Sequence, residues 1–134
     1  MRFRVKIIDG EVVADMNILV SNDDGINAEG IRTLIKALSE VPDIKIYVFA
    51  PDGERSATGH GITMSAPIMV KDEYIKGTEK AYSLSGTPAD CVKFGTRHLR
   101  RQCDIVIDAV FAGINHGGNI GSDVFYSGTL AAAA

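Results

Sequence analysis

Two adjacent carboxylates, Asp23 and Asp24, directly follow a short polar step after the apolar run at 17–20. Neighbouring acidic side chains are costly to hold together unless a cation or a proton offsets their repulsion. Carboxylate oxygens suit hard divalent cations such as Mg²⁺, Mn²⁺ or Ca²⁺. Asp and Gly are also the residues that turns use, so Asp-Asp-Gly alone is typical of a turn. Because Asp-Asp-Gly here follows an apolar strand, the sequence supports a metal site and an ordinary turn equally.

Further polar side chains occur where other apolar runs end. Ser56 follows the run at 44–50, and Asn115 follows the run at 104–112, in a loop with four glycines in nine residues. A hydroxyl and an amide oxygen would complete a shell begun by the two carboxylates, with water in the open places. Ordinary turns and a plain glycine loop are the alternative.

The step Ser127-Gly128-Thr129 opens a final helical pattern. Free backbone N–H groups at a helix start favour a bound phosphate, and glycine lets the group approach closely. The alternative is that Ser127 only caps the helix.

The elements that would position these groups alternate between strand and helix, which favours a mostly parallel sheet. We expect strands at 17–20, 44–50, 67–70, 81–84 and 104–112, and helices at about 31–38 and 88–100. Thr87 is the expected cap of the second helix, with Pro88 in its first turn, and His98 is expected to be solvated near its basic end. In a doubly wound sheet, ligands bind beyond the carboxyl ends of the strands, where the candidate oxygen donors occur.

Residues 1–15 precede Met16 and alternate apolar and charged side chains around Asp9-Gly10, a strong two-residue hairpin signal. We expect either an antiparallel edge hairpin or a non-native leader, with the main domain at 16–134. The last helical pattern has barely begun at Ala134, so the expected fold is truncated at its C-terminus.

Composition restricts the class of protein. A chain of 134 residues with 46% apolar residues is enough for one domain with a core. The net charge of −3 gives no long-range attraction to nucleic-acid polymers or anionic membranes, and no apolar run approaches the roughly 20 residues of a membrane span. Cys91 and Cys103 lack a metal-type spacing and are expected to be reduced thiols of a cytoplasmic protein.

Five strings, in this order and spacing, resemble the SurE survival-protein family. They are NILVSNDDGI at 17–26, APDGERSATGH at 50–60, GTPADCVK at 86–93, GINHGGNIG at 113–121 and YSGT at 126–129. The resemblance covers 16–134 and implies a Rossmann-like three-layer α/β sandwich with a mostly parallel sheet. It also implies a metal-dependent 5′/3′-nucleotidase that hydrolyses nucleoside monophosphates, with Mg²⁺ or Mn²⁺ as cofactor, and a homo-oligomer for the full-length protein.

Position by position, the resemblance implies a metal site and a phosphate site. The implied metal ligands are Asp23, Asp24, Ser56 and Asn115, and the implied phosphate-contacting turn is Ser127, Gly128 and Thr129. The mechanism is then in-line hydrolysis, in which the metal lowers the pKa of a bound water and Asp23 orients that water or accepts its proton. The helix start would stabilise charge on the phosphoryl oxygens.

The chain also departs from the family pattern. Gly53 and Gly61 stand where the family usually has Arg and Ser, and roughly the second half of a family member is absent. About four extra residues lie around 108–111. They add about 13 Å of extended chain at roughly 3.3 Å per residue, so Asn115 would miss the metal unless they form a bulge or loop.

Two alternatives stay open. A phospho-receiver switch domain also places an acidic pair after its first strand, and Asp108 after 105–107 is the candidate acceptor. That interpretation leaves the glycine loop after Asn115 and the Ser-Gly-Thr turn unexplained. The other alternative is an inactive fragment of the nucleotidase, whose missing neighbours would leave sheet edges and apolar faces exposed.

Overall fold

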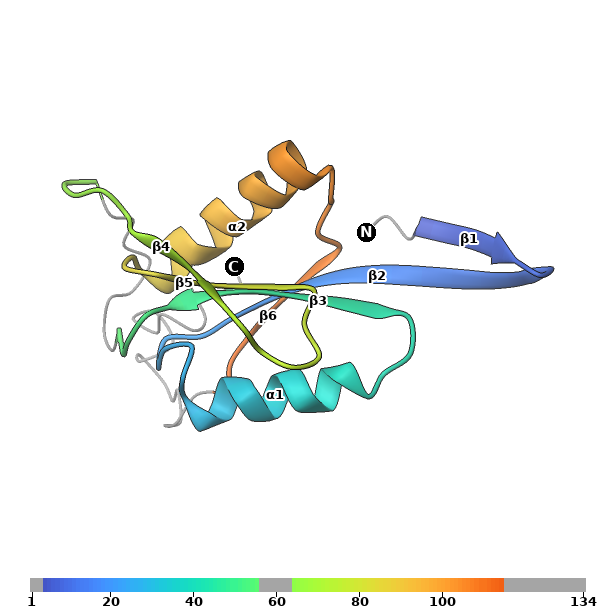
Figure 1. Ribbon diagram of the computed structural model, residues 1–134, viewed down its shortest axis with the longest axis horizontal. Helices are drawn as coiled ribbons and strands as arrows, with labels where there is room; N and C mark the ends of the chain where they lie inside the picture. Colours follow the sequence, from blue (N-terminus) through green and yellow to red (C-terminus); the bar gives the residue numbers. More distant parts are fainter. Residues whose placement is uncertain (1–3, 56–63, 115–134) are drawn as a thin grey trace, which may run out of the picture.

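The structure, a computed structural model, describes residues 4–55 and 64–114. Two helices cover opposite faces of one six-stranded sheet in this part of the chain (Figure 1). The elements are β1 (Arg4–Ile8), β2 (Glu11–Ser21), α1 (Glu29–Ser39), β3 (Ile44–Pro51), β4 (Val70–Glu73), β5 (Lys80–Leu84), α2 (Pro88–Cys103) and β6 (Ala109–Ala112). Neither helix is long and apolar enough to cross a membrane.

The order of strands across the sheet is β4-β5-β3-β2-β6, and β1 pairs with the first part of β2. The pairs β2–β3, β3–β5 and β2–β6 are parallel, whereas β4 is antiparallel to β5. After β2 the chain moves outward through β3 to β5, and α2 then returns it to the other side of β2. The direction of winding therefore reverses at β2, as in a Rossmann-like fold, which confirms the predicted fold class.

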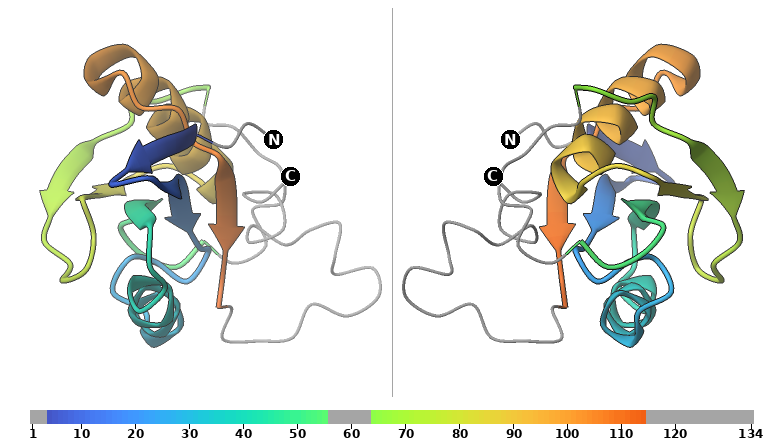
Figure 2. Two further views of the ribbon diagram at one scale, coloured as in Figure 1. Left: turned by 90° about the vertical axis from the view of Figure 1, so that its right-hand side faces the viewer. Right: turned by 90° about the vertical axis from the view of Figure 1, so that its left-hand side faces the viewer.

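The alternation of side chains along β2 builds the three layers. Ile18 and Val20 belong to the buried cluster that contains Ile31 of α1, whereas Leu19 belongs to the cluster that contains Leu99 of α2. Successive side chains of a strand point to opposite faces, so one apolar run serves both layers. Figure 2 shows the result end-on, with the helices on either side of the sheet.

Helix α2 lies very close to the sheet because it carries a glycine at the contact. A Cβ on Gly95 would lie 2.6 Å from the Phe49 ring. The start of α2 is the predicted one: the N–H of Asp90 donates to Thr87 Oγ1 (3.2 Å), and the N–H of Thr87 donates to Asp90 Oδ2 (2.9 Å). This reciprocal capping box, with Pro88 in the first turn, fixes where the helix begins.

Strands β1 and β2 form an antiparallel hairpin around Asp9-Gly10, which extends away from the helices (Figure 1). Both turn residues have positive φ, 51° and 82°, as the tight hairpin turn requires. Strand β2 continues without a break through Met16 into the main sheet.

Three sequence predictions are wrong in detail. The strand expected at 67–70 is β4 at 70–73, and the strand expected at 104–112 is only 109–112 and is half-buried. His98 is not simply solvated: its ring stacks on Phe94 with centroids 5.4 Å apart and meets Tyr82 edge-on at 5.6 Å. These aromatic partners come from a neighbouring helical turn and from β5, which a reading of local charge misses.

Candidate functional site

The acidic pair lies at the carboxyl edge of the parallel sheet, just past the end of β2. The side chain of Asp23 is almost fully buried, with 6% of the residue exposed, and Asp24 is half-buried. The turn that carries them is closed by Asn22, whose Nδ2 donates to the Gly25 carbonyl (2.8 Å). Gly25 has φ of 101°, which L side chains rarely adopt.

The loop after β3 packs directly onto this turn. The N–H of Ile26 donates to the Pro51 carbonyl (2.8 Å), and the N–H of Arg55 donates to the Asp23 carbonyl (2.6 Å). A Cβ on Gly25 would lie 3.0 Å from the backbone of Gly53, so the two loops pack too closely to admit a larger side chain at position 25. The structure thus holds the residue before Ser56 beside the acidic pair.

The Arg55 side chain also ties the loop after β3 to the end of β5. Its Nη2 donates to Asp52 Oδ1 (2.6 Å) and to the Ser85 carbonyl (3.4 Å). The Asp52 N–H in turn donates to the Leu84 carbonyl (2.8 Å). The ion pair is partly solvated and contributes about 1 kcal/mol at most, so its value is in orienting the loop.

Strand β6 brings a third loop to the same edge. Ala112 pairs with Ser21, and the Gly113 N–H donates to the Ser21 carbonyl (3.0 Å). A Cβ on Gly30, in the first turn of α1, would collide with the carbonyl oxygen of Ile114. The chain therefore reaches Ile114, the residue before Asn115, at the level where β2 ends and α1 begins.

The extra residues around 108–111 do not push the end of β6 past the end of β2. The segment before β6 is held at the opposite edge of the sheet, where Asn17 Nδ2 donates to the Val106 carbonyl (3.0 Å). The Asn17 N–H donates to Asp108 Oδ2 (2.8 Å), and the Asp108 N–H donates to the Asn17 carbonyl (2.8 Å). This clamp fixes the register in which β6 joins β2.

The hydrogen bonds between Asn17 and Asp108 also argue against the phospho-receiver interpretation. A receiver acceptor ends a strand at the carboxyl edge, beside the acidic pair. Asp108 instead precedes β6, and its carboxylate caps a backbone N–H at the far end of the strand. The separation between Asp108 and the end of β6 is about 13 Å at roughly 3.3 Å per residue.

Two buried polar atoms next to the acidic pair stand out among the described residues. Ser21 Oγ and Asn22 Oδ1 have no hydrogen-bond partner there, although both residues are 0% exposed. A buried acceptor without a partner is costly, and natural proteins keep few of them. Neither Ser21 nor Asn22 was predicted as a site residue from the sequence. The available signal was two polar side chains in a row at the end of an apolar strand.

The described residues place oxygen donors of the kind that divalent cations prefer at the end of β2. Asp23 and Asp24 provide hard oxygen donors, and the buried acceptors beside them favour a nearby positive charge or donor. Within 4–55 and 64–114, no three His, Cys, Asp or Glu side chains gather closely enough to hold a metal without help. The other predicted positions, Ser56, Asn115, Ser127, Gly128 and Thr129, lie outside the described residues.

The family model for the survival protein SurE matches residues 18–134. The chain belongs to the SurE family. The matched range includes the acidic pair and every position that the motifs assign to the metal and phosphate sites.

Similar SurE proteins are known from several bacteria. The chain is 48% identical over 119 residues to the 5′-nucleotidase SurE of Clostridium beijerinckii, covering 88% of this chain and 45% of that protein. It is 52% identical over 120 residues to the 5′-nucleotidase SurE of Prochlorococcus marinus, covering 88% of this chain and 43% of that protein. The chain thus spans less than half the length of these relatives.

The solved structure of the SurE protein from Aquifex aeolicus has the same fold. It superposes with a TM-score of 0.69 at 34% identity, over 87% of this chain and 44% of that chain. The α/β arrangement with a switch point at β2 is therefore shared with an experimentally determined SurE structure.

Proposed function

We propose that this chain carries the metal-binding half of a phosphomonoesterase that hydrolyses nucleoside 5′- and 3′-monophosphates to nucleoside and phosphate. The observation that carries the proposal is the meeting of three loops at the end of β2. Backbone hydrogen bonds hold Arg55 against Asp23 and Gly113 against Ser21, which brings the chain segments that lead to Ser56 and Asn115 to the acidic pair. The relatives named 5′-nucleotidase SurE support the choice of substrate.

The proposed metal is Mg²⁺ or Mn²⁺, held by Asp23, Asp24, Ser56 and Asn115. All four side chains offer oxygen, which these hard cations prefer. Asp23 is buried and Asp24 is half-buried, and a bound cation would offset the repulsion between these adjacent carboxylates. A bound divalent cation supplies charge stabilisation for the phosphate oxygens and lowers the pKa of water at the site.

The remaining roles belong to the chain's own residues. Asp23 orients the attacking water or accepts its proton, because its carboxylate is held at the edge where substrate arrives. Ser127, Gly128 and Thr129 bind the phosphate oxygens through free backbone N–H groups at a helix start. The nucleoside monophosphate is held locally, since the net charge of −3 gives no general attraction to phosphates.

We also propose a homo-oligomer and a cytoplasmic location for the full-length protein. The two cysteines, Cys91 and Cys103, are free thiols, as expected in a reducing compartment. Nucleic-acid polymers and membranes are not proposed as partners.

Phosphate release from nucleoside 5′- and 3′-monophosphates tests the proposal. The chain is assayed with Mg²⁺, with Mn²⁺ and with EDTA, beside the Asp23→Asn and Asp43→Asn variants. Asp43 is a matched control, since it is exposed, lies at the opposite edge of the sheet and has a φ of 61° that Asn tolerates.

We expect metal-dependent release that Asp23→Asn lowers by roughly tenfold or more, the least cost of disturbing a metal site. Asp43→Asn is expected to retain full release. No release with either metal, or equal release by the wild type and Asp23→Asn, contradicts the proposed function for this chain.

A further inference from the structure

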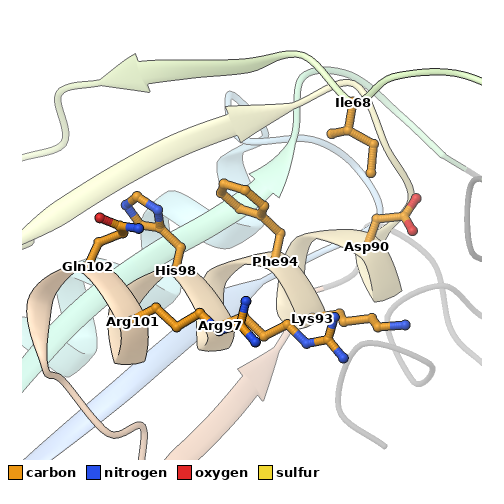
Figure 3. Close-up of a pocket in the computed structure, with 8 residues that line it drawn as sticks. All are labelled: Ile68, Asp90, Lys93, Phe94, Arg97, His98, Arg101 and Gln102. Carbon is orange, nitrogen blue, oxygen red and sulfur yellow. The ribbon is translucent and has the colours of Figure 1, made fainter.

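A hollow of about 410 Å³ lies along α2, and neither residue of the acidic pair lines it. Figure 3 shows Phe94 and His98 on the side of the helix that faces the strands, and Lys93, Arg97 and Arg101 in a row along the helix flank. The hollow has the size of a small-molecule site, which typically occupies a few hundred Å³. It combines an aromatic wall with a basic rim.

The aromatic wall is ordered by its own contacts. The Phe94 and His98 rings stack at 5.4 Å with an interplanar angle of 15°, and Phe94 also meets the buried Phe49 at 6.1 Å. Ile68, in the segment before β4, lies across the hollow from the two rings (Figure 3). A flat, apolar group entering the hollow therefore meets a preformed surface.

The three cations of the rim are spaced four residues apart, so they share one stripe of α2. All three are exposed, and their charged side-chain groups make no ion pair or hydrogen bond with another residue of 4–55 or 64–114. Like charges at this spacing destabilise a helix by a few tenths of a kcal/mol per pair. The stripe is thus an unfavourable arrangement for the helix alone.

The helix macrodipole explains only one end of this stripe. Arg101 lies in the last turn, where a cation is favourable, but Lys93 and Arg97 lie in the middle turns, where the dipole has little effect. A cation there gains little from the helix. The hollow is lined by these three cations and by one carboxylate, Asp90, which caps the start of α2. On a chain of net charge −3, this local excess of positive charge complements a bound anion.

We propose that this hollow binds a small aromatic anion, such as an aryl phosphate, as a site separate from the proposed metal centre. The ring packs against the wall formed by Phe94 and His98, and the anionic group pairs with the cations of the rim. Guanidinium groups suit this role because their planar fork matches phosphate oxygens. This inference goes beyond the proposed hydrolysis and does not rest on it.

Titration by ¹H–¹⁵N NMR with phenyl phosphate as the probe tests the proposal. EDTA is present and the Asp23→Asn background is used, so that the metal centre takes no part. We expect saturable shifts of the amides of residues 93–102. Inorganic phosphate, which has the charge without the ring, and benzyl alcohol, which has the ring without the charge, are expected to bind more weakly.

Two variants that each remove one positive charge from α2 test where the anionic group binds. Arg97→Gln is expected to weaken phenyl phosphate binding about fivefold, the value of one well-placed surface ion pair. Arg100→Gln removes the same charge from an exposed position of α2 that does not line the hollow, and it is expected to leave binding within about twofold.

Absence of saturable shifts at 10 mM probe, or equal weakening by both variants, would overturn the proposal. Tighter binding of a hexaglutamate peptide than of phenyl phosphate would also overturn it, in favour of an acidic protein partner. If phenyl phosphate does not bind in the hollow, the proposed metal-dependent release of phosphate is not affected. The two proposals can therefore be contradicted independently.

Discussion

At Asp23 a carboxylate is almost fully buried at the carboxyl edge of the sheet. Asp23 is 6% exposed, and Asn22 beside it buries an amide oxygen that has no hydrogen-bond partner among the described residues. A folded chain gains little stability from such an arrangement. Local arrangements that work against stability are expected at functional sites, where a ligand offsets the cost.

Cys91 offers a residue-scale test of how tightly α2 packs on the sheet. Burial, and secondarily the charge of Asp90, raises the pKa of its thiol well above the ordinary 9.0. We therefore expect the Cys91 thiol to stay protonated at neutral pH, and a thiol reagent such as Ellman's reagent to modify Cys103 first. Mass spectrometry of the peptides after brief labelling identifies the modified site.

The same shift predicts how stability depends on pH. The folded state holds the Cys91 proton more tightly than the unfolded state, so this contribution is complete below pH 9.0 and is lost as pH rises above it. The slope is at most about 1.4 kcal/mol per pH unit. Urea unfolding between pH 8 and 10 should show a shallower loss for Cys91→Ala; equal slopes contradict the burial argument.

Residue roles that depend on local chemistry were predictable, and those that depend on distant partners were not. Thr87 and Pro88 identify the start of α2 because a cap acts within three residues. His98 was misjudged because its neighbour Tyr82 comes from another element. The contact of Asp108 was not predictable because its partner, Asn17, is 91 residues away in the chain.

At the scale of elements, the contact between two loops determines the shape of the candidate site. Gly25→Ala places a Cβ at φ of 101° and 3.0 Å from the Gly53 backbone. We expect a loss of about 2 kcal/mol or more from backbone strain and crowding together, measured by urea unfolding. We also expect weaker Mn²⁺ binding, because the turn that carries the acidic pair must shift.

Gly10→Ala is the matched control for backbone strain. Gly10 has a φ of 82°, but a Cβ there meets nothing within 4 Å. Its replacement is expected to cost about 1–2 kcal/mol from backbone strain alone, and to leave Mn²⁺ binding unchanged because the hairpin lies at the other end of β2. If both variants affect Mn²⁺ binding alike, the Gly25–Gly53 contact does not shape the site.

Element boundaries follow the same rule of locality. The strand at 44–50 and the helix starting at Pro88 were predicted because apolar runs and caps are local signals. The start of β6 was placed five residues too early, since the apolar side chains at 105–107 resemble a strand. The Asp108 carboxylate takes the Asn17 N–H just before β6 begins, and the strand starts only after this contact.

At the scale of the whole molecule, the alternation of strands and helices was enough to predict the doubly wound sheet. It was also enough to place Asp23 at the carboxyl edge, because parallel strands end together. The close contact of the loops after β2, β3 and β6 was not predictable. It depends on Gly25 and Gly30, where an added Cβ would crowd the backbone of Gly53 and of Ile114, and no spacing in the sequence reveals these contacts.

The boundary near Met16 predicts the effect of removing the hairpin. Among the described residues β1 pairs only with β2, and the pairing of β2 with β3 begins at Met16. We propose that the nucleotidase domain begins there. A chain that starts at Met16 should keep its fold, with a change of about 1 kcal/mol or less in the free energy of unfolding. Loss of cooperative unfolding would show instead that the hairpin belongs to the domain.

The central claim is that the loops at the end of β2 form one divalent cation site. Isothermal titration of Mn²⁺ into the wild type, Asp23→Asn, Asp24→Asn and Asp43→Asn tests it most directly. We predict one site, weakened by roughly tenfold or more in each of the first two variants and by less than about twofold in Asp43→Asn. Equal Mn²⁺ affinity in the wild type and the Asp23→Asn and Asp24→Asn variants would contradict the claim.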